Sequence, residues 1–205
     1  IGHSEKVFNM KRLLLILILT FSFQTLTKAD DIKDFEIEGI SIGDSLLDYF
    51  NENEILSTLK KQPSNGYLYP SKKYRSAQFI DSSKFSNYEK VIVAFRDKDK
   101  QFIIEHIMGV IEYKNNFSKC FIKINSVENA IDDFKSDFSK NKRTYYHSGD
   151  PTGKSKITQV GYEFANGPII LTSCADWSKE TNITDALRVE IQSKNFRIFV
   201  EETYN

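Results

Sequence analysis

The stretch from Asn116 to Lys140 constrains the fold more than any other part of this 205-residue chain. Most of its apolar residues are three or four positions apart, which is the spacing that places side chains on one face of an α-helix. These residues are Phe117, Cys120, Phe121, Ile124, Val127, Ile131, Phe134 and Phe138. We therefore predict a long amphipathic helix at about 117–140.

Segments rich in β-branched and aromatic residues lie on both sides of this helix. The segments that we predict as strands are 74–80, 88–96, 102–113, 157–164, 169–177 and 184–193. Further helices are predicted at 52–61 and at 195–204. Clustered strands joined by short turns favour an antiparallel sheet. The predicted fold class is α+β, with an antiparallel β-sheet covered by the helix at about 117–140.

The predicted elements also follow a repeated order. A helix followed by three strands occurs at about 45–115 and again at about 116–193. The two halves share no sequence motif, so only the order of elements suggests a repeated helix-plus-three-strand unit.

Residues near the beginning of the chain have the three parts of a secretory signal peptide. Two basic residues follow Met10, an apolar segment covers 13–23, and small residues precede a cleavage position after Ala29. The apolar segment is too short to cross a bilayer comfortably, which makes an uncleaved anchor the less favoured alternative. We predict an upstream, non-native extension at 1–9, a signal peptide at 10–29 and a single mature α+β domain at 30–205.

If the protein is exported, the state of its two cysteines, Cys120 and Cys174, can be predicted. In an oxidising compartment, two cysteines form a bridge more often than a metal site or a catalytic nucleophile. We predict a disulfide between Cys120 and Cys174, which would tie the amphipathic helix to a strand. Two buried free thiols are the alternative.

The charge of the chain and the spacing of its histidines limit which classes of ligand can be expected. The chain has 28 basic and 28 acidic residues, and removing the signal peptide leaves it mildly acidic. Such a surface gives no reason to expect nucleic acid as a partner, or stable membrane insertion after signal cleavage. Neither His106 nor His147 belongs to a cluster with metal-ligand spacing, so we expect no metal and no cofactor.

The run Gly43-Asp44-Ser45-Leu46 resembles the signature of the GDSL family of esterases and lipases. The resemblance implies that Ser45 is a nucleophile. A serine needs a base within hydrogen-bond reach, and the later Gly-x-Asn-Asp and Asp-x-x-His motifs of that family are missing here. Ser45 and Asp48 instead have the spacing of a helix capping box. We interpret the match as coincidental and keep a serine esterase using Ser45 as the alternative function.

A second run, from Gly149 to Ser155, resembles a phosphate-binding loop that is one residue short between its glycines. A strand is predicted after it, whereas phosphate binding requires the N-terminus of a helix at that point. We therefore interpret this run as a turn.

Three segments together resemble small exported proteins of AT-rich marine bacteria, a group without an assigned activity. The segments are ADDIKDFEIEGISIGDSLLDYF, KNNFSKC and TGKS…CADWS. The resemblance implies that the GDSL run is structural and that the cysteines are paired, and it transfers no catalytic residue.

The remaining candidates for a site are polar and aromatic residues near predicted strand ends. Asp176 and Trp177 end one predicted strand, and Tyr67 and Tyr69 lie in a loop before another. Such residues can form a ligand or partner surface, although a tryptophan at a strand end more often fills the edge of a core. We expect a periplasmic or secreted bacterial protein, most simply a non-catalytic binding or interaction module. Its partner would be a protein or a small molecule of the cell envelope.

Overall fold

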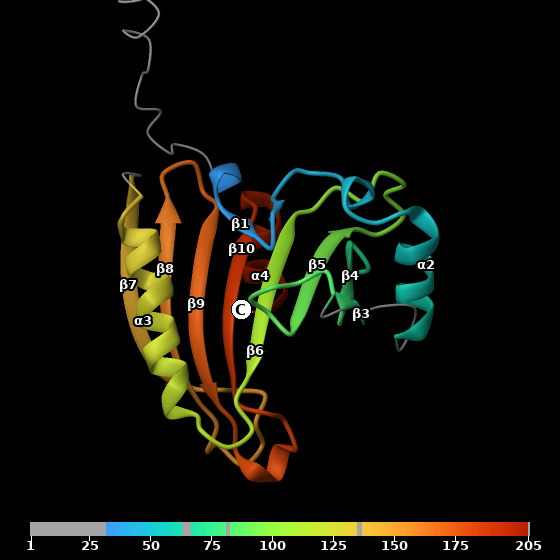
Figure 1. Cartoon of the computed structure of the whole chain (residues 1–205). Coiled ribbons are helices and arrows are strands. Elements are labelled where there is room, and N and C mark those ends of the chain that lie inside the picture. The colour runs from blue at the N-terminus through green and yellow to red at the C-terminus, as the bar shows by residue number, and fades with distance from the viewer. Residues whose placement is uncertain (1–31, 63–66, 81–82, 135–136, 205) are drawn as a thin grey trace, which may run out of the picture.

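An antiparallel sheet forms the body of the protein in the computed structural model, which describes residues 32–62, 67–80, 83–134 and 137–204 (Figure 1). Within these residues the sheet has eight strands in the order β3-β4-β5-β6-β10-β9-β8-β7, and every neighbouring pair is antiparallel. The strands are β3 (Tyr67–Leu68), β4 (Tyr74–Phe79), β5 (Lys90–Arg96), β6 (His106–Glu112), β7 (Phe138–Tyr146), β8 (Lys156–Phe164), β9 (Ile169–Asp176) and β10 (Ala186–Gln192).

Helices lie on both faces of the sheet and beside one edge (Figure 1). They are α2 (Glu52–Lys61), α3 (Ser118–Asp132) and α4 (Lys194–Tyr204). A short hairpin, β1 (Glu36–Ile37) and β2 (Ile40–Ser41), and the 3-10 turns η1 (Ile32–Asp34), η2 (Leu46–Asp48) and η3 (Lys179–Thr181) complete the described elements. Helix α3 packs against β9 and β10, and α2 packs against β4. In Figure 1, α3 lies in front of the sheet and α4 behind it.

The predicted α+β class with an antiparallel sheet is confirmed, and so is the disulfide. Cys120 of α3 is bonded to Cys174 of β9, with their Cα atoms 5.9 Å apart. None of the described helices is long and apolar enough to cross a membrane. The predicted signal peptide at 10–29 and the extension at 1–9 lie outside the described residues.

The predicted extent of the long helix, 117–140, is wrong at its C-terminal end. Helix α3 ends at Asp132, and Phe138 begins strand β7. Phe138 continues the helical spacing in the sequence, but it is turned inward by pairing with Phe164 and packs 5.1 Å from the ring of Tyr162. The position of Phe138 thus fits the spacing of a helix as well as that of a strand. Pairing at the edge of the sheet makes it part of a strand.

The order of elements is a helix and four strands, twice. Helix α2 precedes β3 to β6, helix α3 precedes β7 to β10, and β6 pairs with β10 at the centre of the sheet. The predicted unit had three strands, because the residues of β7 were assigned partly to the helix and partly to a loop, and β3 to a loop.

The core lies mainly between the sheet and the elements on the α3 side. Strands β5, β6 and β10 supply alternate buried residues to this side, and α3 adds Cys120, Ile124 and Ile131. A smaller cluster on the opposite face holds α4, with Phe196 and Phe199 packed against Tyr74 and Ala94. Both faces near β4 and β5 are therefore covered, which explains their apolar runs.

Candidate functional site: a groove at the edge of the sheet

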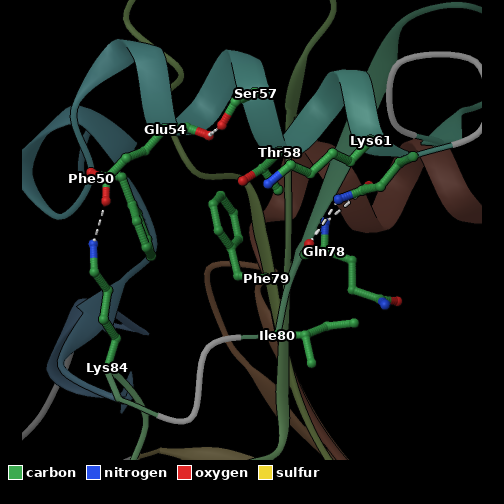
Figure 2. A pocket seen from close by; sticks show the side chains of 10 residues that line it. Phe50, Glu54, Ser57, Thr58, Lys61, Gln78, Phe79, Ile80 and Lys84 are labelled. Carbon is green, nitrogen blue, oxygen red and sulfur yellow. Dashed lines mark hydrogen bonds and ion pairs between the residues drawn. The ribbon is translucent and has the colours of Figure 1, made fainter.

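A groove of about 590 Å³ lies between α2 and the outer edge of β4 (Figure 2). Helix, strand and the loop residue Lys84 contribute its lining. The residues are Phe50, Glu54, Ser57, Thr58, Lys61, Gln62, Gln78, Phe79, Ile80 and Lys84. We call it the edge groove.

Helix α2 forms one wall because its sequence separates an apolar from a polar face. Asn51 caps the helix, with its side chain accepting from the Glu54 backbone while the Glu54 carboxylate accepts from the Asn51 backbone. Ile55 and Leu59 are buried. A polar stripe at helical spacing, which includes Glu54, Ser57, Thr58 and Lys61, lines the groove instead.

The opposite wall is the backbone of β4, and Gln62 is bonded to it. The Gln62 Nε2 donates to the Gln78 carbonyl at 2.7 Å, and the Gln78 N–H donates to Gln62 Oε1 at 3.1 Å. A primary carboxamide offers the same donor and acceptor as a peptide unit. The Gln62 side chain therefore occupies the position of a neighbouring strand at this one residue.

The place of Gln78 in the sheet explains why its main chain faces the groove. Strand β3 pairs only with Ser76 and Arg75 of β4. Gln78 lies two positions beyond Ser76, so its N–H and C=O point to the same outer side. The backbone of an edge strand is a template for pairing with another chain. In the described residues, the Gln62 side chain is what bonds to that template.

Aromatic rings and a lysine form the floor of the edge groove. The rings of Phe50 and Phe79 stack at 4.3 Å. The Lys84 ammonium lies 4.5 Å from the centre of the Phe50 ring and forms a 2.9 Å ion pair with Glu54. At the end of β4, Ile80 is 65% exposed. The groove thus combines main-chain bonding groups, an apolar side chain and ammonium groups.

The four residues proposed from sequence as a surface are not brought together. Trp177 is only 8% exposed and packs against Ile157 and Ala175. Asp176 beside it is exposed as a whole residue, but partial desolvation of its carboxyl group and the nearby Asp185 raise its pKa. Tyr69 packs against two rings of α4, and Tyr67 is on β3. Four strands separate β3 from β9 in the sheet.

Ser45 acts as the N-cap of η2. Its Oγ accepts from the Leu47 N–H at 3.2 Å and donates to the Gln101 carbonyl at 2.6 Å. The Asp48 carboxylate accepts from the Ser45 N–H, which completes a capping box. Of the histidines that the structure describes, His106 stacks on Phe196 and His147 lies against Trp177.

In the run from Gly149 to Ser155, which resembles a phosphate-binding loop, the backbone and hydroxyl donors bind the carboxylate of Asp150. Asp150 accepts hydrogen bonds from the backbone and hydroxyl of Thr152, from the Lys154 backbone, and from the backbone and hydroxyl of Ser155. Burial raises the pKa of Asp150, but these donors outweigh it and hold the pKa well below its usual value. The loop geometry does bind an anion, and that anion is Asp150.

Sequence reasoning missed the edge groove. The only signal was a polar stripe on the helix at 52–61 followed directly by Gln62, and neither indicates a partner. The described residues contain no group of histidine, cysteine, aspartate or glutamate side chains able to hold a metal ion. Comparisons with protein-family models, with curated proteins and with solved structures find no match.

Proposed function

We propose that this protein is an exported, non-catalytic binding module that takes extended segments of other polypeptides into the edge groove. The bound segment would lie between α2 and β4 and pair with the outer edge of β4. Binding by addition of a strand draws its affinity from main-chain hydrogen bonds and its specificity from alternate side chains.

The observation that carries this proposal is the pair of hydrogen bonds between the Gln62 carboxamide and the Gln78 main chain. An incoming peptide unit can replace both bonds, so the exchange leaves no backbone group of Gln78 unsatisfied. A side chain that can rotate away also costs less to displace than a strand.

The side chains of the edge groove indicate which segments fit best. The exposed side chain of Ile80 favours an apolar residue beside it. Lys61 has no ion-pair partner within the described residues and lies on the polar stripe of α2. A carboxylate on the ligand, from a side chain or a C-terminus, would complement Lys61.

The setting that we propose is the periplasm or the exterior of a bacterial cell. The support for export is the signal-like segment at 10–29 together with the Cys120–Cys174 disulfide, because disulfides persist in oxidising compartments. The resemblance to exported proteins of marine bacteria agrees with this setting. The partner would then be a polypeptide of the cell envelope.

Two architectural features belong to the same proposal. We infer that α3 serves as the cover of the β9–β10 side of the sheet, and that the two halves derive from one helix-plus-strands unit. The order of elements supports a duplication. In that account the edge groove belongs to the first half, between α2 and its own sheet edge.

The alternative, an esterase using Ser45, has less support because the Ser45 hydroxyl is engaged in the cap of η2. An assay with short-chain esters on the wild type and on Ser45→Ala tests it. Turnover that disappears in Ser45→Ala would replace the binding proposal.

A selection from a displayed library of random linear peptides tests peptide binding. Selected peptides should bind the wild type, and Gln78→Pro should weaken them at least tenfold because proline removes the outward N–H. Gln62→Ala should tighten them severalfold, since its carboxamide no longer competes. Gln101→Ala, at another exposed glutamine, is the control and should change nothing.

Melting temperatures of the variants exclude loss of folding as the cause. The proposal is contradicted if no peptide is enriched over an unrelated protein. It is equally contradicted if a folded Gln78→Pro variant binds as the wild type does.

A further inference from the structure

Two arginines each lie over an aromatic ring on the face of the sheet opposite α3. The Arg143 guanidinium is 4.9 Å from the centre of the Tyr145 ring, and that of Arg188 is 5.5 Å from the Trp177 ring. The pairing of the strands shows on which face of the sheet these arginines lie. Cys174 and Leu187 are paired and lie on the α3 side, so Arg188, the next residue along β10, points to the other side.

The two arginines belong to one row across four adjacent strands. Arg143 pairs with Gln159, Gln159 with Ser173, and Ser173 with Arg188. Three strand spacings put the arginine Cα atoms about 14 Å apart. Gln159 and Ser173 between them are buried, so the arginines are the charged side chains of this row.

Tyr145 lies under the Arg143 guanidinium and within electrostatic reach of Arg188. Burial raises the pKa of its phenol, Arg143 and Arg188 act to lower it, and Glu190 acts to raise it. Trp177 adds a largely buried indole whose Nε1 has no hydrogen-bond partner among the described residues.

Arg188 has no carboxylate or carbonyl acceptor within the described part of the chain. Of the nearest acids on its face, Glu112 is paired with Lys90, and Glu190 lies 3.4 Å from His106 Nε2. Burial raises the pKa of Glu190, but His106 and Arg188 outweigh it; Arg188 is thus near Glu190 without forming an ion pair with it in the described residues. Arg143 uses two of its N–H groups on Gln159 Oε1. A half-buried guanidinium without an acceptor favours an external anion of planar, bidentate geometry.

We propose that this row is a docking surface for an acidic segment of a partner protein, with Arg188 holding a carboxylate and Arg143 a second one. Carboxylates have the planar shape that the guanidinium fork matches. The full sequence carries no net charge, and the form without the predicted signal peptide is mildly acidic, so the protein lacks the long-range attraction that a long polyanion such as nucleic acid requires. A short acidic segment needs only the local field of the two arginines.

This surface is independent of the edge groove. It lies on β7 to β10, whereas the edge groove lies beside β4, on the far side of β5 and β6. Failure of one binding test leaves the other unaffected.

Trp177 is the only tryptophan of the chain, which supplies a local probe. We expect a short oligo-glutamate peptide to change Trp177 emission saturably and with a salt-dependent affinity. Arg188→Gln should weaken binding at least tenfold. Arg188→Lys should recover only part of it, because lysine keeps the charge without the planar fork. Arg96→Gln, at an exposed arginine elsewhere, should bind as the wild type.

Calorimetry on the same variants separates binding from a change in the probe itself. An oligo-glutamine peptide of equal length is the uncharged control, and heparin is the contrasting polyanion. No saturable response to oligo-glutamate, equal binding by Arg188→Gln and Arg96→Gln, or tighter binding of heparin with no dependence on Arg188 would each overturn the proposal.

Discussion

At the scale of single residues, the ring of Tyr88 leaves no room for a side chain at Gly109 on β6. A Cβ atom at this position would lie 2.5 Å from Cδ1 and 2.7 Å from Cε1 of Tyr88. The Tyr88 ring is held in place by burial, which together with Glu38 raises its pKa to about 12. The strand therefore passes under an aromatic ring that only glycine accommodates.

We predict that Gly109→Ala lowers the free energy of unfolding by about 1–3 kcal/mol, the usual cost of overpacking. Urea denaturation measures it. Gly161→Ala is the control, because its Cβ would meet only the flexible side-chain ends of Leu171, at 3.3 Å, and Ile169, at 3.6 Å. Equal urea midpoints for Gly109→Ala and the wild type would contradict the packing described for Tyr88.

Asp150 gives the protein a residue-level dependence on acid. Its folded pKa is held below the unfolded value by five donors. A depressed carboxyl pKa stabilises the fold at pH values above the unfolded pKa, about 4, and the contribution is lost progressively as pH falls below that value.

We therefore predict that Asp150→Asn has a lower urea midpoint than the wild type at pH 7, and that the difference shrinks by pH 3. Asp176→Asn is the control of opposite sign, because the pKa of Asp176 is raised; it should not destabilise the protein at pH 7. A gap between Asp150→Asn and the wild type that is the same at both pH values would argue against this role.

At the scale of elements, α4 depends on two phenylalanines. Phe199 is 2% exposed and packs 4.8 Å from the ring of Tyr74, whereas Ile198 beside it is 40% exposed. Phe199→Ala should destabilise the protein by about 3 kcal/mol through the cavity it leaves, and Ile198→Ala by no more than about 0.5 kcal/mol. Thermal melts of both variants test this, and similar losses would mean that α4 is not docked by this face.

The elements also show which parts of the fold a sequence can reveal. Helix α2 and the inner strands carry strong periodic signals and were predicted, as was the C-terminal helix. Strand β7 was missed because an edge strand exposed on most of its length has no apolar alternation. Phe138 then fitted the helical period by coincidence, and the predicted helix at 117–140 extended too far.

The candidate site could not be predicted for a different reason. Gln62 and Gln78 are 16 positions apart, and their relation exists only once α2 packs beside β4. The disulfide was predictable because the number of cysteines and the signal-like segment at 10–29 can both be read from the sequence. By contrast, the hydrogen bonds between the Gln62 carboxamide and the free edge of β4 exist only in the assembled sheet.

At the scale of the whole molecule, the two proposed surfaces occupy different parts of one sheet. The edge groove lies beside α2 and β4, and the arginine row lies across β7 to β10 on the face opposite α3 (Figure 1). A disulfide fixes α3 to β9, on the face of the sheet opposite the arginine row. A protein with both proposed surfaces would bridge two polypeptides.

The most direct test of strand addition is an NMR titration of the full chain with a selected peptide. The predicted result is a coupled change at the Gln78 amide and the Gln62 side-chain amide, with cross-strand contacts between the Gln78 backbone and the peptide backbone. Binding that leaves the Gln78 and Gln62 resonances unmoved would contradict the account.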